Sequence, residues 1–289
     1  MIALLPQVIV DGLLTGSIYA IVAVGLTMVF GVMRIVNFAH GDFLMIGLYV
    51  TYVFSAWLGV DPYIAVIAIL PIVTLLASLS FRFLIRPIIG TSEHNQVVVT
   101  LGISLILQNI ALVVFSADLR TIPSAFSTSK FHIGSVIVRD AAAVACVISI
   151  AVCIGLYWFL KNTAMGRSIR ATAEDAAAAQ LCGISSERMY MLAFCLGVGS
   201  LGLVAPLIAP IYYVSPSSGV TFTLTAFIIV VLGSLGNFLG ALAGGLIIGV
   251  IESIGSLLTS GSMSNILTYG LFILILLFRP SGLFGRARL

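Results

Sequence analysis

Polar side chains that could line a transport pathway gather in one short stretch between apolar segments. Within six residues, Asn37 supplies an amide, His40 an imidazole and Asp42 a carboxylate, and Arg34 lies three residues before the first of them. Two interpretations fit this pattern. One is a turn at the membrane interface whose polar groups satisfy one another. The other is a broken helix that lines a translocation pathway or its cytoplasmic mouth.

Further polar residues lie inside runs that are otherwise apolar. Glu252 is the clearest case, because an ionised carboxylate inside a bilayer costs about 3 kcal/mol or more unless it is paired. Such a residue is a candidate functional group, and a hydrogen bond across a helix bundle is the structural alternative. The amides Gln108 and Asn109 lie in another apolar run and could join helices by hydrogen bonds. All three are candidate pathway residues.

A short internal repeat links the first polar stretch to a later one. A Phe-Gly pair precedes an Asn-Phe pair within residues 30–38, and a Leu-Gly pair precedes an Asn-Phe pair within residues 232–238. Transporters often contain structural repeats that meet at a shared site. We therefore expect the two glycine-rich breaks, 31–42 and 233–245, to face each other near the pathway, with Asn237 as the candidate residue of the second break.

Motifs for catalysis, metal binding and nucleotide binding are absent from the sequence. The only lysines, Lys130 and Lys161, do not follow a glycine, so there is no phosphate-binding P-loop. The three histidines are scattered, no Gly-x-Ser-x-Gly elbow occurs, and the four cysteines show no metal-ligand spacing. We predict no catalytic residues, no metal site and no cofactor, and we expect that the chain does not hydrolyse ATP itself.

The composition places these residues in a membrane protein. Of 289 residues, 61% are hydrophobic and 8% are charged, whereas soluble domains carry roughly 25% charged residues. The mean hydropathy is +1.23. Such a chain cannot cover a globule with polar surface, which excludes a soluble enzyme. The net charge of +3 is too small for a polyanionic partner, so no nucleic acid is expected.

We predict an all-α integral membrane protein, a polytopic helix bundle with broken helices that forms one transmembrane domain over residues 1–289. Lipid satisfies no backbone groups, and the apolar runs do not alternate with period two, so helices are favoured over a barrel. Nine spans are expected, or eight if residues 220–258 form one interrupted element. The spans cover residues 8–30, 43–58, 63–81, 97–116, 141–160, 190–210, 220–233, 238–258 and 265–278.

Charge placement orients this bundle. In a nine-span arrangement, ten of the thirteen Lys and Arg residues fall on one side, which is cytoplasmic by the positive-inside rule. The N-terminus is then outside and the C-terminus inside. The other three basic residues lie in the longest external loop, residues 117–139, whose composition is compatible with a small external cap.

The longest cytoplasmic connection, residues 161–188, is rich in alanine and predicts one or two short helices at the membrane surface. Helix propensity is high from about Ser168 to Leu181, and Gly183 is a natural helix stop. Ser185-Ser186-Glu187 then offers a capping start for the next span. The segment is either a solvated connector or a docking helix whose Arg and carboxylate groups contact a cytoplasmic protein.

The same segment resembles the coupling loop of branched-chain amino-acid ABC importer permeases. The residues that carry this resemblance are Met165-Gly166-Arg167, Arg170-Ala171, Ala173-Glu174-Asp175 and Gly183-Ile184. Similarity to the family continues in order along nearly the whole chain. It includes Tyr19-Ala20-Ile21, Gly25 to Gly31, Ile35 to Asp42, Arg86-Pro87, Gln108-Asn109, Val231 to Gly236 and Arg279 to Arg286. The chain is most similar to the first of the family's two permease subunits.

The resemblance implies the membrane-embedded half of an ABC importer in a bacterial inner membrane. The implied partners are a second permease subunit in a hetero- or homodimer, two ATPase subunits, a periplasmic substrate-binding protein and membrane lipid. The residues implied to couple the permease to the ATPase are Arg167, Arg170, Glu174, Asp175 and Gly183. The general ABC importer motif has Glu-Ala-Ala before a glycine, whereas Ala177-Ala178-Ala179 precedes Gly183 here.

We therefore expect a permease subunit that translocates branched-chain or other apolar amino acids by alternating access, driven by separate ATPase subunits. Amides, urea and aromatic acids are alternative solutes, because related permeases carry them. A stand-alone secondary transporter or channel for a small solute is the other alternative, and it would need an ion site built from several intramembrane charges. A membrane-embedded enzyme would need a convergent set of catalytic groups that the sequence lacks.

Overall fold

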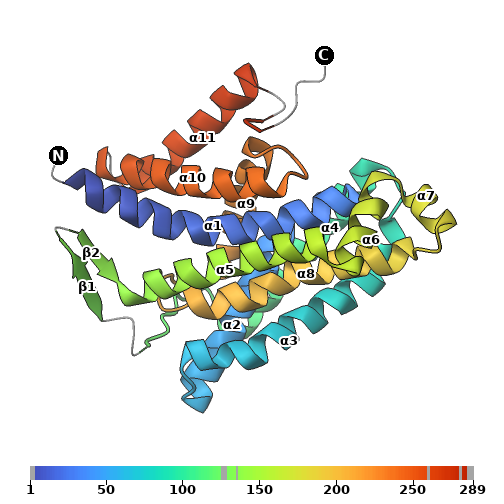
Figure 1. The fold of residues 1–289 in the computed structure, drawn as a ribbon. Coiled ribbons are helices and arrows are strands. Elements are labelled where there is room, and N and C mark those ends of the chain that lie inside the picture. The colour runs from blue at the N-terminus through green and yellow to red at the C-terminus, as the bar shows by residue number, and fades with distance from the viewer. Residues whose placement is uncertain (1–3, 125–128, 135, 259–260, 280–281, 285–289) are drawn as a thin grey trace.

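The computed structural model describes residues 4–124, 129–134, 136–258, 261–279 and 282–284. In these residues the chain is mostly helical, with long apolar helices, two short polar helices and one β-hairpin (Figure 1). The long helices are α1 (Leu5–Met33), α2 (His40–Leu58), α3 (Pro62–Ser80), α4 (Glu93–Phe115), α5 (Asp140–Asn162), α8 (Ser186–Ile208), α9 (Ser218–Leu232), α10 (Phe238–Leu258) and α11 (Gly261–Phe278). After α3, the chain continues through a π-helical turn, η2 (Phe81–Ile85), and a 3-10 turn, η3 (Arg86–Ile88).

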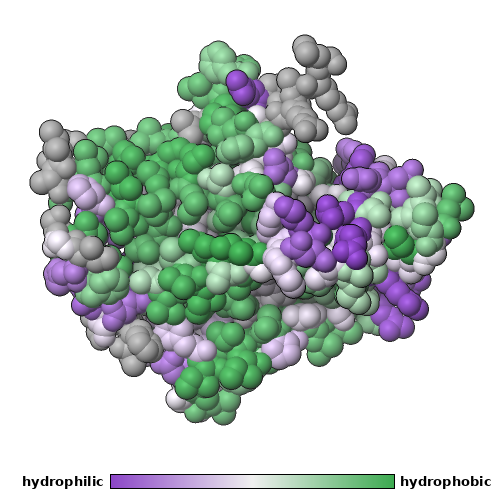
Figure 2. Space-filling model, in the orientation of Figure 1, coloured by the Kyte–Doolittle hydropathy of each residue, from purple (hydrophilic) through white to green (hydrophobic). Residues whose placement is uncertain are grey.

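Seven helices in the described part of the chain are long and apolar enough to cross a membrane, and two shorter apolar helices accompany them. Figure 2 shows hydrophobic residues covering the middle of one face of the molecule, with polar residues gathered toward its two ends. One polar end carries the short helices α6 (Ala164–Glu174) and α7 (Ala176–Leu181), and the other carries the hairpin (Figure 1). The chain is thus a polytopic membrane protein, as the composition predicted.

The core of the bundle forms around α1. In this helix 78% of the most apolar window is buried inside the chain, against 17% in α5. Glycines explain the close approach of its neighbours. A Cβ atom on Gly16 would lie 2.9 Å from Leu246 Cα of α10, and one on Gly12 would lie 2.6 Å from Val250 Cα. Small residues spaced four apart therefore join α1 and α10 as an antiparallel pair.

Both breaks are shorter than the sequence predicted. In the first break only residues 34–39 are non-helical, because α1 continues past Gly31 and α2 begins at His40. Arg34 ends α1 in the left-handed region, with φ 56°. Two of the candidate polar residues therefore belong to the first turn of α2 and lie within a helix.

The second break comprises residues 233–237, between α9 and α10. A Cβ atom on Gly244 of α10 would lie 3.1 Å from the carbonyl oxygen of Ile229 in α9. The chain thus reverses direction at this break and the two helices pack side by side. Residues 220–258 form two helices, and the alternative of one interrupted element was wrong.

The connection between α4 and α5 carries the described β-structure. β1 (Lys130–Ile133) pairs antiparallel with β2 (Val136–Arg139), with Lys130 opposite Arg139. Part of the predicted loop 117–139 lies outside the described residues, namely 125–128 and 135. The hairpin leads directly into α5 at Asp140.

Candidate translocation site and coupling segment

Asn37 lies in the first break, and its hydrogen bonds shape the start of α2. Its side-chain oxygen accepts a hydrogen bond from the backbone N–H of Ala39 at 3.2 Å, and its carbonyl oxygen accepts one from the N–H of His40 at 3.2 Å. The residue is 1% exposed, and its amide nitrogen has no hydrogen-bond partner among the described residues. Asn37 therefore shapes the helix start and still offers a free donor inside the protein.

His40 shows that α2 begins deep inside the bundle. The imidazole is fully buried, and its Nε2 donates to the carbonyl oxygen of Val22 at 3.0 Å. Val22 lies eleven positions before the end of α1 at Met33, which corresponds to roughly 16 Å along a helix axis. The connection between α1 and α2 thus turns back into the bundle, and the first turn of α2 lies at the depth of the middle of α1.

Asp42 is the least satisfied polar group of the candidate set. It is fully buried, and neither carboxylate oxygen meets hydrogen-bond geometry with any described residue. Its side chain contacts Gly219 at the start of α9. Next to it, the N–H of Gly41 donates to Thr223 Oγ1 at 2.8 Å. A buried carboxylate is costly for stability unless neighbouring groups pair with it or hydrogen-bond to it.

Helix α4 brings one predicted amide to this carboxylate and turns the other away. Gln108 and Ser104 lie near Asp42, and Gln108 Nε2 donates to Ser104 Oγ at 2.8 Å. Asn109 is exposed, and its amide nitrogen donates to the carbonyl oxygen of Leu105 in its own helix at 2.8 Å. Gln108 is therefore part of the buried polar region, and Asn109 faces outward.

Glu252 lies in a separate polar cluster between α1 and α10. Tyr19 donates its hydroxyl to Glu252 Oε1 at 3.3 Å. The Tyr19 ring packs edge-on against the Phe222 ring, with centroids 6.4 Å apart. The Tyr212 ring also packs against the Phe222 ring, with centroids 5.6 Å apart. Sequence reasoning selected Glu252 and missed the tyrosines, because a tyrosine in an apolar helix resembles ordinary core filling.

The second break repeats the local chemistry of the first. Asn237 Oδ1 accepts a hydrogen bond from the N–H of Gly240 at 3.1 Å and so caps the start of α10, much as Asn37 shapes the start of α2. The last turn of α1 touches the second break, since a Cβ atom on Gly31 would lie 3.3 Å from Gly236 Cα. The two glycine-rich stretches therefore lie next to each other, as expected, and their place near a translocation pathway stays a prediction.

The segment 161–188 folds as two short helices, as its alanine content predicted. The side chain of Thr163 caps α6 at the N–H of Gly166, at 3.0 Å. Asp175 ends α6 and caps α7 by accepting from the N–H groups of Ala177 and Ala178, at 2.9 and 3.0 Å. Of the two alternatives, one short helix or two, the structure has two, because Asp175 ends the first helix and starts the second.

The end of this segment follows the predicted stop signal. Gly183 adopts φ +81°, a left-handed conformation that favours glycine. Ser185 precedes α8 but makes no side-chain cap, so that part of the prediction was wrong. The hydroxyl of Ser186 instead donates to the carbonyl oxygen of Ala176 at 3.0 Å and ties α7 to α8.

The charged groups of the coupling segment remain open to solvent. Arg167 donates to the carbonyl oxygen of Asn162 at 3.1 Å, and Arg170 lies 3.5 Å from that of Lys161. In the described residues neither arginine forms an ion pair. Glu174 and Asp175 are exposed, and Leu181 at the end of α7 is 92% exposed.

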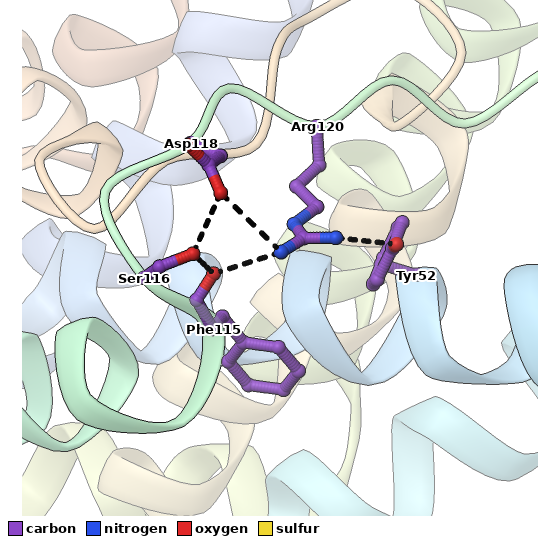
Figure 3. A network of polar contacts seen from close by, with 5 residues as sticks. All are labelled: Tyr52, Phe115, Ser116, Asp118 and Arg120. Carbon is purple, nitrogen blue, oxygen red and sulfur yellow. Dashed lines mark hydrogen bonds and ion pairs between the residues drawn. The ribbon is translucent and has the colours of Figure 1, made fainter.

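At the opposite end of the bundle, Arg120 organises a polar network that the sequence did not reveal (Figure 3). Its guanidinium donates to Tyr52 Oη at 2.9 Å and to the carbonyl oxygen of Phe115 at 3.0 Å, and it lies 3.8 Å from Asp118 Oδ2. Ser116 Oγ donates to Asp118 Oδ2 at 2.8 Å. The network joins the ends of α2 and α4.

Comparisons with known proteins place these features in a family. The family described as branched-chain amino acid transport system / permease component matches residues 8–276. The high-affinity branched-chain amino acid transport system permease protein BraD of Pseudomonas aeruginosa is 33% identical over 97% of this chain and 95% of its own length. The permease proteins LivH of Salmonella typhimurium and Escherichia coli K12 are 32% and 31% identical with the same coverage. No solved structure matches.

Proposed function

Because the chain belongs to the family of branched-chain amino acid transport permeases, we propose that it carries branched-chain amino acids through a bacterial inner membrane. The observation that carries this proposal is the match of the family over residues 8–276, together with relatives of the same length that are named as high-affinity permeases for these solutes. The chain is a multi-pass membrane subunit of an ABC importer. It has no ATPase site of its own, so ATP is hydrolysed by a separate subunit.

Nine membrane crossings, with the N-terminus outside and the C-terminus inside, are our proposed topology. It is supported by the antiparallel packing of α1 with α10 and by the ion pair between Arg86 and Glu187, whose side-chain nitrogen and oxygen lie 2.9 Å apart. This pair joins two of the basic connections that the charge rule assigns to the cytoplasm. The hairpin end would then face the periplasm.

Transport proceeds in this proposal by alternating access at the buried polar region. The first turn of α2 and the first turn of α9 meet at Asp42 and Gly219, so two helix N-termini adjoin an unpartnered carboxylate at membrane depth. Interrupted helices commonly provide the substrate sites of transporters. The residues of this region would be Asn37, His40, Asp42 and Gln108. The other candidates would line other parts of the pathway or lie at its interfaces, namely Glu252, Asn109 and Asn237.

The α6–α7 segment would dock the ATPase. Its support is that Leu181, Arg167 and Glu174 of this segment are all exposed, on the end of the molecule that carries the basic connections. The remaining partners in this proposal are a second permease subunit, a second ATPase subunit and a periplasmic binding protein. The second permease would cover part of the exposed apolar surface of α4 and α5.

Copurification tests this assignment. An affinity-tagged copy of the chain, expressed with its chromosomal neighbours and extracted in mild detergent, should bring down an ATPase and a second permease. Cells that lack the chain should lose high-affinity leucine, isoleucine and valine uptake and regain it on complementation. Isolation of the chain without any ATPase, with uptake unchanged by the deletion, would refute the proposal.

A further inference from the structure

A pocket of about 280 Å³ opens between the ends of α1 and α5 and the short helix α6. Its floor is apolar and is formed by Met28 and Val32 of α1, Leu160 of α5 and Ile169 of α6. Gly236 of the α9–α10 connection closes one side. The pocket thus lies where the apolar bundle meets the polar coupling segment, at the level of the headgroups in the proposed topology.

Basic side chains surround the opening of this pocket. Lys161 and Arg170 line it, and none of its described lining residues is acidic. The Lys161 ammonium lies 5.7 Å from the centroid of the Tyr157 ring, a cation–π contact that holds it at the rim. In the described part of the chain neither Lys161 nor Arg170 has an ion-pair partner. The pocket therefore presents positive charge that no ion pair among the described residues neutralises.

The lining also contains a polar atom without a partner. Thr27 lies on the pocket wall and is 2% exposed, yet its hydroxyl oxygen makes no hydrogen bond with any described residue. Buried hydroxyls are normally satisfied by protein or ordered water. A ligand with an ester or phosphate oxygen near Thr27 would supply the missing partner.

We propose that this pocket binds one anionic phospholipid of the cytoplasmic leaflet, with its phosphodiester at Lys161 and Arg170 and an acyl chain on the apolar floor. A free phosphate ion would leave the apolar lining in contact with water. A neutral hydrocarbon chain alone would leave the two cations without a counter-charge. Basic pockets between membrane helices on the cytoplasmic side are suited to such headgroups. The proposal does not depend on which solute the importer carries.

The position of the lipid would give it a role in coupling. Gly31 and Gly236, at which the last turn of α1 touches the second break, line the same pocket as Ile169 and Arg170 of α6. A lipid in the pocket therefore contacts both the coupling helix and the two touching segments. Its presence would hold α6 against the bundle and favour transmission of movement from the ATPase.

Native mass spectrometry of the purified importer tests the proposal. The probes are phosphatidylglycerol, phosphatidylcholine with the same acyl chains, and glycerol phosphate as a headgroup without chains. The wild-type complex should retain phosphatidylglycerol in preference to the other two. Lys161→Gln should lower this retention about fivefold, the contribution expected of one basic side chain near an anionic headgroup. The matched control Arg82→Gln removes an exposed cation that does not line the pocket and should leave retention unchanged.

A second variant tests the apolar floor. Ala173→Trp would fill the pocket from α6 and should abolish phosphatidylglycerol retention while the complex still assembles. Equal retention of the two phospholipids, or glycerol phosphate binding as well as the lipid, would overturn the proposal. So would Lys161→Gln retaining as much phosphatidylglycerol as Arg82→Gln. Loss of assembly in Ala173→Trp leaves the lysine comparison as the deciding measurement.

Discussion

Gly31 at the end of α1 and Gly236 in the α9–α10 connection meet backbone to backbone, because a Cβ atom on Gly31 would lie 3.3 Å from Gly236 Cα. Gly236 adopts φ +83°, a conformation that glycine accepts without strain. If transport proceeds by alternating access, we expect the end of α1 and the α9–α10 connection to close against each other and separate at this contact.

Gly31→Leu should hold these two segments apart. The leucine side chain would enter the contact between Gly31 and Gly236 and would not enter a tightly packed interface between two helices. We therefore expect normal assembly and at least tenfold slower uptake. Gly41→Leu is the matched packing variant, since a Cβ atom there would collide with the carbonyl oxygen of Gly219 inside the bundle. That variant should fail to assemble. Normal uptake by Gly31→Leu, or loss of its assembly, would contradict a moving contact.

Asp42→Asn should preserve the fold and impair transport. The substitution keeps the shape of the side chain and removes a buried charge that no described hydrogen bond satisfies, so the complex should be at least as heat-stable as wild type. If the carboxylate contacts the solute in transit, leucine uptake should fall at least tenfold. Glu93→Gln, at an exposed glutamate in the first turn of α4, is the control. Wild-type uptake by Asp42→Asn would remove this residue from the pathway.

Local signals in the sequence predicted the coupling segment well, because alanine propensity and a glycine stop act over a few residues. Gly183 ends the short helices as expected, with φ +81°. The cap that Asp175 forms between α6 and α7 was missed, since the alanines around it favour one continuous helix. Asn37 and Asn237 precede helix starts and accept hydrogen bonds from nearby backbone N–H groups, a role that the sequence analysis did not predict.

Tertiary relationships could not be predicted in the same way. Gln108 and Asn109 are adjacent in an apolar run, and packing of α4 on α2 leaves Gln108 half-buried and Asn109 exposed. The hydrogen bond from Arg120 to Tyr52 joins residues 68 positions apart. Hydropathy identifies a span but does not specify which neighbouring helices it contacts. These side-chain contacts could therefore be identified only from the structure.

Leu181→Asp should uncouple the importer. This side chain is 92% exposed at the end of α7, so a charge there would not disturb the fold of the chain but would disrupt an apolar contact with the ATPase. We expect loss of ATPase copurification and of ATP-driven uptake. Leu119→Asp, which alters a 68% exposed leucine near the other end of the bundle, should change neither. Retention of the ATPase by Leu181→Asp would place docking elsewhere.

The native cysteines provide a direct test of orientation. Cys182 is exposed beside α7, whereas the other three cysteines are buried or half-buried in long helices. A membrane-impermeant maleimide should therefore label Cys182 in inside-out vesicles and not in intact spheroplasts. Ala117→Cys in a Cys182→Ser background should show the reverse pattern, because residue 117 is exposed at the opposite end of the bundle. Labelling of Cys182 from the periplasmic side would invert the proposed topology.

Solute accumulation in proteoliposomes tests the central claim most directly. The chain is reconstituted with its second permease, its ATPases and the external binding protein, and ATP is enclosed on the ATPase side. Radiolabelled leucine should accumulate above its external concentration only with hydrolysable ATP, and omission of this chain should abolish the uptake. Leucine movement by the chain alone, driven by an ion gradient or flowing passively without ATP, would contradict the assignment as an ABC importer permease.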